Sequence, residues 1–146
     1  MNGEQQPKEI SKKMCMECGA KCCRNICIEI EAPTTRQFRE NIRWYLAHKN
    51  VSIFVEEGSW YIEFHTDCEM RTPENACLVY HNRPLMCRGY GYDDDGDINC
   101  FISNLPFNYE YEFHTLEEFD RYLTELSAKS EQTRKKRTAR KSEISA

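Results

Sequence analysis

The chain has 146 residues, the usual size of a single domain, and 40% of them are hydrophobic, so it can bury one modest core. No apolar run reaches the roughly 18 residues needed to cross a membrane, and residues 1–13 lack the apolar stretch of a signal peptide. These features argue against a transmembrane segment and against export, and they predict a cytoplasmic protein whose thiols are reduced.

The formal net charge of -4 is unevenly distributed along the chain. Residues 129–146 contain seven basic and two acidic side chains, which leaves 13 basic and 22 acidic side chains, a net charge of -9, in residues 1–128. We expect a disordered leader over residues 1–14, a cysteine-cluster metal-binding domain over residues 15–128 and a basic tail over residues 129–146. Such a tail suits contact with nucleic acid or another acidic surface, although a solvated helix end that frays is the commoner outcome.

The first elements follow from hydrophobic periodicity. Residues 28–30 alternate like a short strand. A helix is predicted next, because Thr34 and Gln37 have the spacing of a capping box and four apolar residues follow at helical intervals. This helix should end between His48 and Asn50. Its apolar stripe is Phe38, Ile42, Tyr45 and Leu46.

A β-hairpin is predicted after this helix. Two alternating runs, residues 51–55 and 60–64, flank the turn sequence Glu57-Gly58-Ser59. The aromatic side chains of Trp44, Trp60 and Phe64 fit the core stripes of the helix and the hairpin.

The last predicted element is a helix that starts near Leu116 and fades into the basic tail. Thr115 and Glu118 form a capping box at its start. The expected fold class is therefore α+β, a small single domain with a β-hairpin, two main helices and cysteine-rich loops organised by metal.

Nine cysteines fall within the first hundred residues. Four form the run Cys15-x2-Cys18-x3-Cys22-Cys23, and three more belong to a second stretch that starts about fifty residues later. Closely spaced thiols in a chain without an export signal are typical of metal ligands rather than disulfides. The predicted metal ligands are Cys15, Cys18, Cys22, Cys23, Cys68, Cys77 and Cys87.

Seven thiols exceed the four that a closed tetrahedral zinc site requires. A single ion with spare cysteines, a dinuclear site and an iron–sulfur cluster therefore remain open, and zinc or iron is the expected cofactor. Several thiolates on one divalent ion leave a net negative centre, and Arg83 and Arg88, which flank Cys87, are placed to donate N–H groups to that cofactor. Pro84 favours an extended conformation for Arg83 and so fixes the turn that presents Cys87.

The remaining sulfurs and the nearby histidines are expected to have no metal role. Cys27 and Cys100 are predicted to pack as small hydrophobic side chains. His65 and His81 lie near or within the second motif, but a surface or hydrogen-bonded position is expected for both. The acidic run from Asp93 to Asp97 does not match a calcium loop, because acid ligands are missing from the first and twelfth positions.

The two cysteine motifs resemble those of the YkgJ-like cysteine-cluster family of bacteria and archaea, which is described as a zinc- or iron-chelating domain. The resemblance covers about residues 15–92 and implies that these cysteines chelate a metal. The chain departs from the family pattern at Glu69-Met70 and at Gly89-Tyr90-Gly91. The matching residues are Cys15-x2-Cys18-x3-Cys22-Cys23, Cys68 and Cys77-x2-Tyr80-x2-Arg83-Pro84-x2-Cys87-Arg88.

These features favour a metal-binding protein with a structural, redox or interaction role, whose partners are the metal ion and another protein. A related cysteine cluster occurs in flagellin lysine methylases, so the alternative is a metal-dependent enzyme or enzyme subunit. A thiol–disulfide sensor that uses Cys22 and Cys23 is a third hypothesis. The chain contains no fingerprint for a methyl donor or a nucleotide, which argues against a complete methylase.

Overall fold

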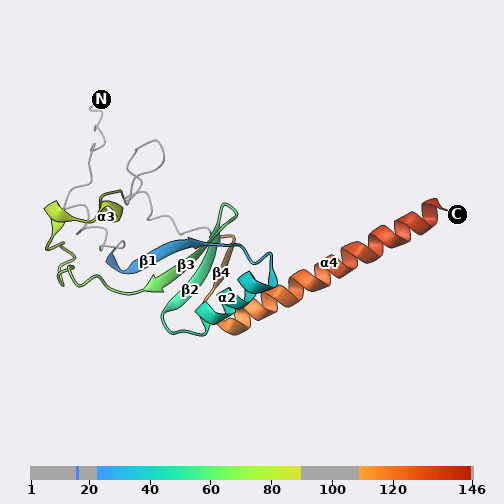
Figure 1. The fold of residues 1–146 in the computed structure, drawn as a ribbon, viewed down its shortest axis with the longest axis horizontal. Coiled ribbons are helices and arrows are strands. Elements are labelled where there is room, and N and C mark those ends of the chain that lie inside the picture. Colours follow the sequence, from blue (N-terminus) through green and yellow to red (C-terminus); the bar gives the residue numbers. More distant parts are fainter. Residues whose placement is uncertain (1–15, 17–22, 90–108, 146) are drawn as a thin grey trace, which may run out of the picture.

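A four-stranded antiparallel sheet forms the centre of the molecule (Figure 1). The computed structural model describes Met16 and residues 23–89 and 109–145. In this part of the chain the strand order is β1-β3-β2-β4, and the sheet with its helices confirms the predicted α+β class. The strands are β1 (Asn25–Ile30), β2 (Val51–Glu56), β3 (Ser59–His65) and β4 (Tyr111–Phe113), and the helices are α2 (Arg36–Leu46), the 3-10 helix η2 (Tyr80–Asn82), α3 (Leu85–Gly89) and α4 (Leu116–Ile144).

Several predicted features lie outside the described residues. They include the leader over residues 1–14 and the acidic run from Asp93 to Asp97. The cysteines outside the described residues are Cys15, Cys18, Cys22 and Cys100.

The predicted hairpin is confirmed as β2 and β3. Their register pairs Val55 with Trp60, so the apolar residues of both strands share one face of the sheet. The turn residues Glu57 and Gly58 have φ angles of 48° and 81°. Two successive positive φ angles give the tight turn whose twist matches that of the flanking strands. Ser59, expected in the turn, is the first residue of β3.

The start of α2 differs from the prediction by one residue. Thr35 is the N-cap, because its Oγ1 accepts a hydrogen bond from the N–H of Phe38 at 3.1 Å. The predicted capping box of Thr34 and Gln37 is therefore wrong. Gln37 instead donates its side-chain amide along the helix to Asn41 Oδ1 at 3.0 Å.

The end of α2 also comes earlier than predicted. The helix stops at Leu46, and Ala47 is its C-cap. Asn50 then adopts a φ of 60°, a left-handed conformation that asparagine tolerates better than most residues. This reversal leads the chain directly into β2.

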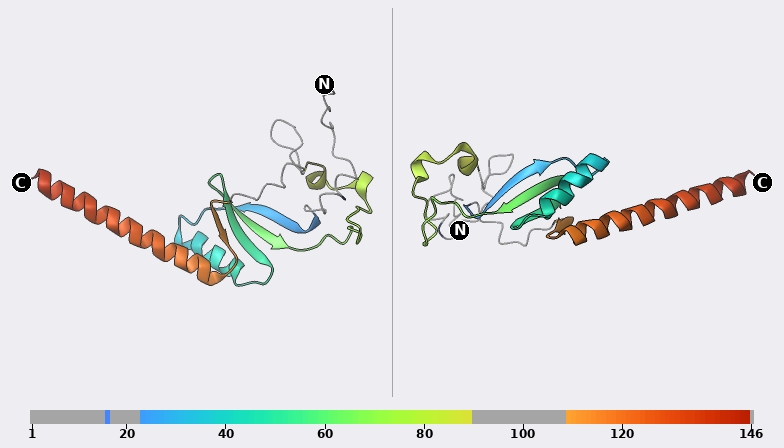
Figure 2. Two further views of the ribbon diagram at one scale, coloured as in Figure 1. Left: turned by 180° about the vertical axis from the view of Figure 1, so that it is seen from behind. Right: turned by 60° about the horizontal axis from the view of Figure 1, so that its bottom comes forward.

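The hydrophobic core lies between one face of the sheet and the helices α2 and α4 (Figures 1 and 2). Phe119 of α4 is fully buried and meets the ring of Phe113 edge-on, with 5.4 Å between ring centroids. Trp60 of β3 also meets the ring of Phe119 edge-on, with 6.4 Å between ring centroids. The buried core residues are Ile42, Leu46, Ile53, Val55, Trp60, Ile62, Phe113 and Phe119.

The assignment of Trp44 to the core is wrong, because its side chain is 64% exposed. Ile42 faces the sheet and is 1% exposed. Two residues along an α-helix correspond to a rotation of about 200°, so Trp44 points away from the sheet when Ile42 points toward it. The predicted core positions of Trp60 and Phe64 agree with the structure, in which Trp60 is buried and Phe64 packs against the core.

Helix α4 starts at Leu116 as predicted and is attached to the body only by its first turns. Thr115 and Glu118 form the predicted capping box. Arg43 of α2 donates to both carboxylate oxygens of Asp120, at 2.8 and 3.3 Å. From residue 124 to residue 145 every side chain is exposed; the helix lines a surface cavity beside α2 as far as Arg134, and Figures 1 and 2 show its C-terminal part projecting from the sheet. Among the described helices, none is both long enough and apolar enough to cross a membrane.

The contrast between Phe119 and Trp44 predicts very different costs for two aromatic-to-alanine changes. Phe119→Ala opens a cavity among packed rings and should lower the free energy of unfolding by about 3–5 kcal/mol. Trp44→Ala should change it by about 0.5 kcal/mol, because the ring is mostly in solvent. Urea unfolding followed by circular dichroism measures both, and equal losses would contradict the assigned core.

The capping box predicts a pH-dependent contribution from Glu118. Its Oε2 accepts from the backbone N–H groups of His114 at 2.6 Å and Thr115 at 3.3 Å, and these bonds lower the pKa of the carboxyl. The pKa of Glu118 is lower in the folded protein than in the unfolded chain, where it is about 4.3. The charged carboxylate therefore stabilises the fold at pH values above about 4.3, and this stabilisation is lost as the pH falls through the pKa of the folded state. Glu118→Gln should therefore cost a few tenths to about 1 kcal/mol at pH 7 and almost nothing at pH 2.

Glu117→Gln is the matched control, because it removes a neighbouring charge from the same helix turn. Urea midpoints at pH 7 and pH 2 should separate the two variants at neutral pH only. An equal effect of both variants at pH 7 would assign the stabilisation to the helix dipole alone.

Candidate metal centre

Cys23, the described end of the first cysteine motif, is joined to the second motif by backbone hydrogen bonds just beyond the paired strands β1 and β3. Thr66 N donates to Arg24 O at 2.9 Å, and Cys68 N donates to Cys23 O at 2.7 Å. Cys23 is the last cysteine of the first motif, and Cys68 is the first cysteine of the second. More than forty residues of sequence separate them, yet a backbone hydrogen bond joins them directly.

A short hairpin brings Cys77 back toward Cys68. Arg71 N donates to Cys68 O at 3.1 Å, and Arg71 pairs with Cys77 in an antiparallel bridge. Thr72 N donates to Ala76 O at 2.8 Å and closes the loop between them. Cys23, Cys68 and Cys77 are therefore linked by one continuous network of backbone hydrogen bonds.

Cys87 lies on the short helix α3, which follows a turn braced by two arginines. Arg83 adopts the extended conformation expected before proline, with φ of -60° and ψ of 145°. Its Nε donates to Tyr80 O at 2.9 Å, and its guanidinium lies over the Tyr80 ring at 4.1 Å. Arg88 donates to Arg83 O at 3.0 Å and to His81 O at 3.2 Å. Both arginines thus brace the turn, and their donation to a metal-bound sulfur stays a prediction.

Arg71 is a cation near the cysteines that sequence reasoning missed. Its side chain is 15% exposed; Nη1 donates to Asn75 Oδ1 at 3.0 Å, and Nη2 lies 3.1 Å from Asp67 Oδ1. Within the described part of the chain, Arg71 Nε is buried and has no hydrogen-bond acceptor. The available signal was the position of this arginine inside a loop bounded by Cys68 and Cys77.

Asn75 connects a second arginine to the same loop. Its Oδ1 also accepts from Arg24 Nη2 at 3.3 Å. Its φ of 64° is left-handed, a conformation in which asparagine is enriched. The side-chain oxygen of Asn75 therefore accepts hydrogen bonds from both guanidinium groups and holds Arg24 and Arg71 close to the loop between Cys68 and Cys77.

Cys27 differs from the predicted ligands in both position and chemistry. It lies on β1 opposite Glu63 and is exposed, so the prediction that it packs as a small hydrophobic side chain is wrong. Desolvation of the thiol, followed by the charges of Glu63 and Glu56, raises the pKa of Cys27 to about 11. These surroundings disfavour the thiolate form that a metal ligand must have.

The two histidines have the hydrogen-bonded or surface positions that the sequence predicts. His65 Nε2 lies 2.9 Å from Ser52 Oγ, and Nδ1 lies 3.1 Å from Asn25 Oδ1. His81 is exposed and stands edge-on to the Tyr80 ring. Both ring nitrogens of His65 are thus engaged on the sheet.

The described cysteines alone do not complete a metal site. Among Met16, residues 23–89 and residues 109–145, no three metal-ligand side chains form a group that could hold an ion. The described members of the predicted ligand set are Cys23, Cys68, Cys77 and Cys87, and the other three lie outside this part of the chain. The predicted ligand set therefore stays a prediction.

The chemistry around the two motifs fits a zinc or iron centre. The donor set is thiol sulfur, which both metals bind as thiolate. An anionic sulfur centre requires nearby N–H donors, and the buried Arg71 Nε is a donor without an acceptor at the junction of the motifs.

Two surface cavities lie elsewhere on the molecule. One of about 460 Å³ lies between β1 and α2, and one of about 500 Å³ lies beside the junction of α2 with α4. Both are lined by residues away from the described cysteines.

A family model described as CxxCxxCC, "putative zinc- or iron-chelating domain", matches residues 14–107. The match includes both cysteine motifs and 94 of the 146 residues. No curated protein and no solved structure matches the chain. As its cysteine motifs predict, the chain belongs to the CxxCxxCC family of zinc- or iron-chelating domains.

Proposed function

We propose that this protein binds zinc or iron through thiolates that converge from its two cysteine motifs, and that the metal holds the cysteine-rich segment in its fold. Membership of the CxxCxxCC family supports zinc or iron as the bound metal. Thiol chemistry and the bonded network through Cys23, Cys68 and Cys77 support these sulfurs as ligands. The proposed ligands are drawn from Cys15, Cys18, Cys22, Cys23, Cys68, Cys77 and Cys87.

The observation that carries the proposal is that residues 65–89 have no hydrophobic core of their own. None of them is buried, and the side chains of Leu78, Leu85 and Met86 are 68%, 82% and 80% exposed. Ordering a backbone costs about 1–2 kcal/mol per residue, and apolar burial in this segment is too small to offset that cost. Bonds between thiolates and a metal supply the missing stabilisation in small metal domains.

The metal would act as a crosslink between the sheet and the cysteine-rich segment. Cys23 belongs to the sheet side, since β1 begins two residues later, whereas Cys77 and Cys87 belong to the hairpin and to α3. Cys68 joins the two sides through its bond to Cys23. A metal shared by sulfurs on both sides would tie α3 and the 71–77 hairpin to the end of β3.

Arginines around the motifs would balance the negative charge of the thiolates. Arg24 and Arg71 meet at Asn75, and Arg83 and Arg88 brace the turn before Cys87. Zinc with four thiolates carries a net charge of about -2, and such a centre is costly in a low dielectric unless donors and cations surround it. This arrangement is the reason for assigning the arginines to the metal centre rather than to a separate anion site.

The metal requirement predicts a specific effect of Cys68→Ser. Loss of this thiolate should reduce the bound metal to less than half of the wild-type stoichiometry and should expose residues 66–89 to trypsin, which cleaves after arginine. Elemental analysis of anaerobically purified protein and timed proteolysis measure both effects.

The wild-type protein identifies the metal. Visible absorbance would assign an iron–sulfur cluster, and colourless protein with stoichiometric zinc would assign zinc.

Cys27→Ser is the matched control for Cys68→Ser. The Cys27 thiol has a raised pKa and lies on the sheet, so its loss should leave the metal content and the proteolysis pattern unchanged. Equal metal loss in both variants would contradict the assigned ligand set. Wild-type protein that contains neither metal after anaerobic purification would contradict the function itself.

A second prediction concerns Arg71, which we assign as a donor to a metal-bound sulfur. Arg71→Gln should lower the metal affinity about 10–100-fold while leaving the stoichiometry at saturating metal unchanged, the effect typical of lost outer-shell partners. Titration against a coloured chelator measures the affinity. Arg36→Gln, on the exposed start of α2, is the charge-matched control and should have no effect. Equal affinities of the two variants would remove Arg71 from the metal centre.

A further inference from the structure

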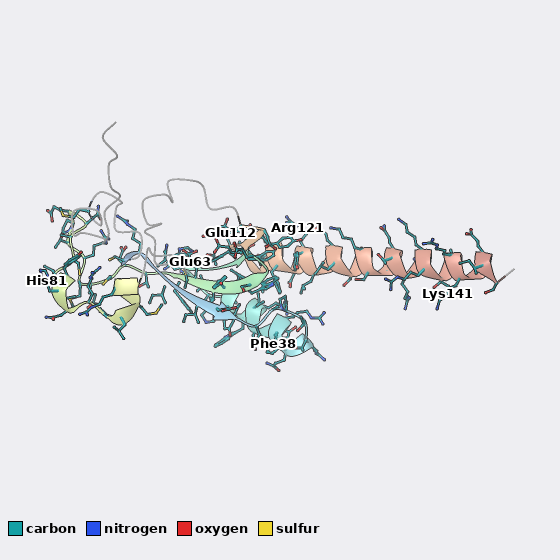
Figure 3. All side chains as sticks on the ribbon, turned by 90° about the horizontal axis from the view of Figure 1, so that it is seen from above. Phe38, Glu63, His81, Glu112, Arg121 and Lys141 are labelled. Atoms are coloured by element: carbon teal, nitrogen blue, oxygen red, sulfur yellow. The ribbon has the colours of Figure 1, made fainter. Side chains whose placement is uncertain are left out.

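The exposed part of α4 is a free helix with its own charge. Tyr122 and Leu123 are the last side chains of α4 that pack against the core, and all side chains from residue 124 to residue 145 are exposed. As far as Arg134 the helix still lines a surface cavity with Pro33 and Arg39. Figure 3 shows Lys141 far along this helix, at the opposite end of the molecule from His81. At 1.5 Å per residue, the helix continues about 27 Å from Leu123 to Lys141.

The basic side chains of this helix gather on one side. At about 100° per residue, six of the seven fall within an arc of about 160°, and Glu131 and Glu143 fall outside it. Lys135 also lies outside the arc and is paired with Glu131 at 3.2 Å. We call the six residues the basic face, and its members are Lys129, Arg134, Lys136, Arg137, Arg140 and Lys141.

The exposed part of α4 has few apolar contacts to stabilise it. A helix that is polar on all sides depends mainly on pairs between its own side chains, such as Lys135 with Glu131. The basic face also places Lys136, Arg137 and Arg140 within one turn of each other, where like charges repel. An anionic partner would relieve this repulsion.

We propose that the basic face of α4 binds double-stranded DNA by contacts to phosphate groups in the major groove. An α-helix is about 10–12 Å across, and the major groove of B-DNA is about 12 Å wide. An arc of about 160° presents cations to both walls of the groove. In bZIP and bHLH dimers, basic helices that continue without a break from the dimerisation region lie in the major groove.

The composition of the helix favours nucleic acid over a membrane surface. Helices that lie on membranes carry a broad apolar face opposite their basic face. Between residues 127 and 145 the apolar side chains are only Ala128, Ala139 and Ile144, and Ile144 lies on the basic side. No apolar face is therefore available to enter a lipid layer.

The acidic body does not cancel the attraction of the helix for DNA. Residues 1–128 carry a net charge of -9 and residues 129–146 a net charge of +5. The Debye length in physiological salt is about 8 Å, and Arg140 and Lys141 lie about 9 Å or more along the helix axis beyond Arg134, which still lines a cavity with the body. The body should instead limit contact with DNA to the projecting helix. This activity is separate from metal binding and does not rest on it.

The test is binding of the full chain to a fluorescent 20-base-pair DNA duplex, measured by anisotropy between 50 and 200 mM KCl. Six phosphate contacts predict a logarithmic salt slope of about -5, and so a loss of affinity of about a thousandfold over this range. The variant Lys129→Gln/Lys136→Gln/Arg140→Gln removes three charges from the basic face. The salt slope of this variant should become shallower, at about -3, and its affinity at 50 mM KCl should be at least tenfold weaker than that of the wild type.

The control variant Arg36→Gln/Lys49→Gln/Lys135→Gln removes three charges from outside the basic face, and circular dichroism checks that both variants keep their helix content. The control should bind as the wild type does. Equal losses in the two variants, or no binding by the wild type at 50 mM KCl, would overturn the proposal. Binding that is as tight to duplex RNA, or to vesicles with 30% phosphatidylserine, would also overturn it in favour of that partner.

Discussion

The pairing of β1 with β3 is the constraint on which the cysteine-rich end depends. Strand β3 is bonded on both sides, to β1 and to β2, and carries Trp60 and Ile62 into the core. A slip of one residue would turn these side chains to the opposite face, so burial fixes the register. Past the strand ends, Thr66 lies opposite Arg24 in the same register, and the hydrogen bond from Cys68 to Cys23 is offset from that register by one residue. The hydrophobic core thus brings Cys68 close to Cys23.

The two ends of the body are held by different physical effects. Around Phe119 the core is dense with aromatic rings, and burial supplies the stability. Between residues 65 and 89 hydrogen bonds and a stacked guanidinium define turns, but no apolar side chain is buried. Hydrogen bonds in solvent contribute little net free energy, so they specify this geometry without stabilising it strongly. A metal centre would supply stability where hydrophobic burial does not.

Sequence patterns over a few neighbouring residues correctly predicted the helices and strands that such neighbours determine. The hairpin followed from alternation around Glu57-Gly58, and α4 followed from the capping box of Thr115. Strand β4 was missed, because three residues are too few for a periodic pattern and their strand form comes from pairing with β2. Trp44 was misplaced, since hydrophobicity alone does not give its angle on the helix. Arg71 was missed for a similar reason: its importance comes from an unpaired nitrogen that only folding buries.

The molecule separates its charges along its length. The thiol-rich segment and the acidic body occupy one end, and the basic face of α4 occupies the other (Figure 3). An ion pair between Arg43 of α2 and Asp120, near the start of α4, helps to join the two helices. Screening over about 8 Å prevents a change of charge at the cysteines from reaching Lys141 directly. Any influence of the metal on the helix would therefore have to pass through the packed sheet. A partner on α4 would bind at the opposite end of the molecule from the metal-binding segment (Figure 3).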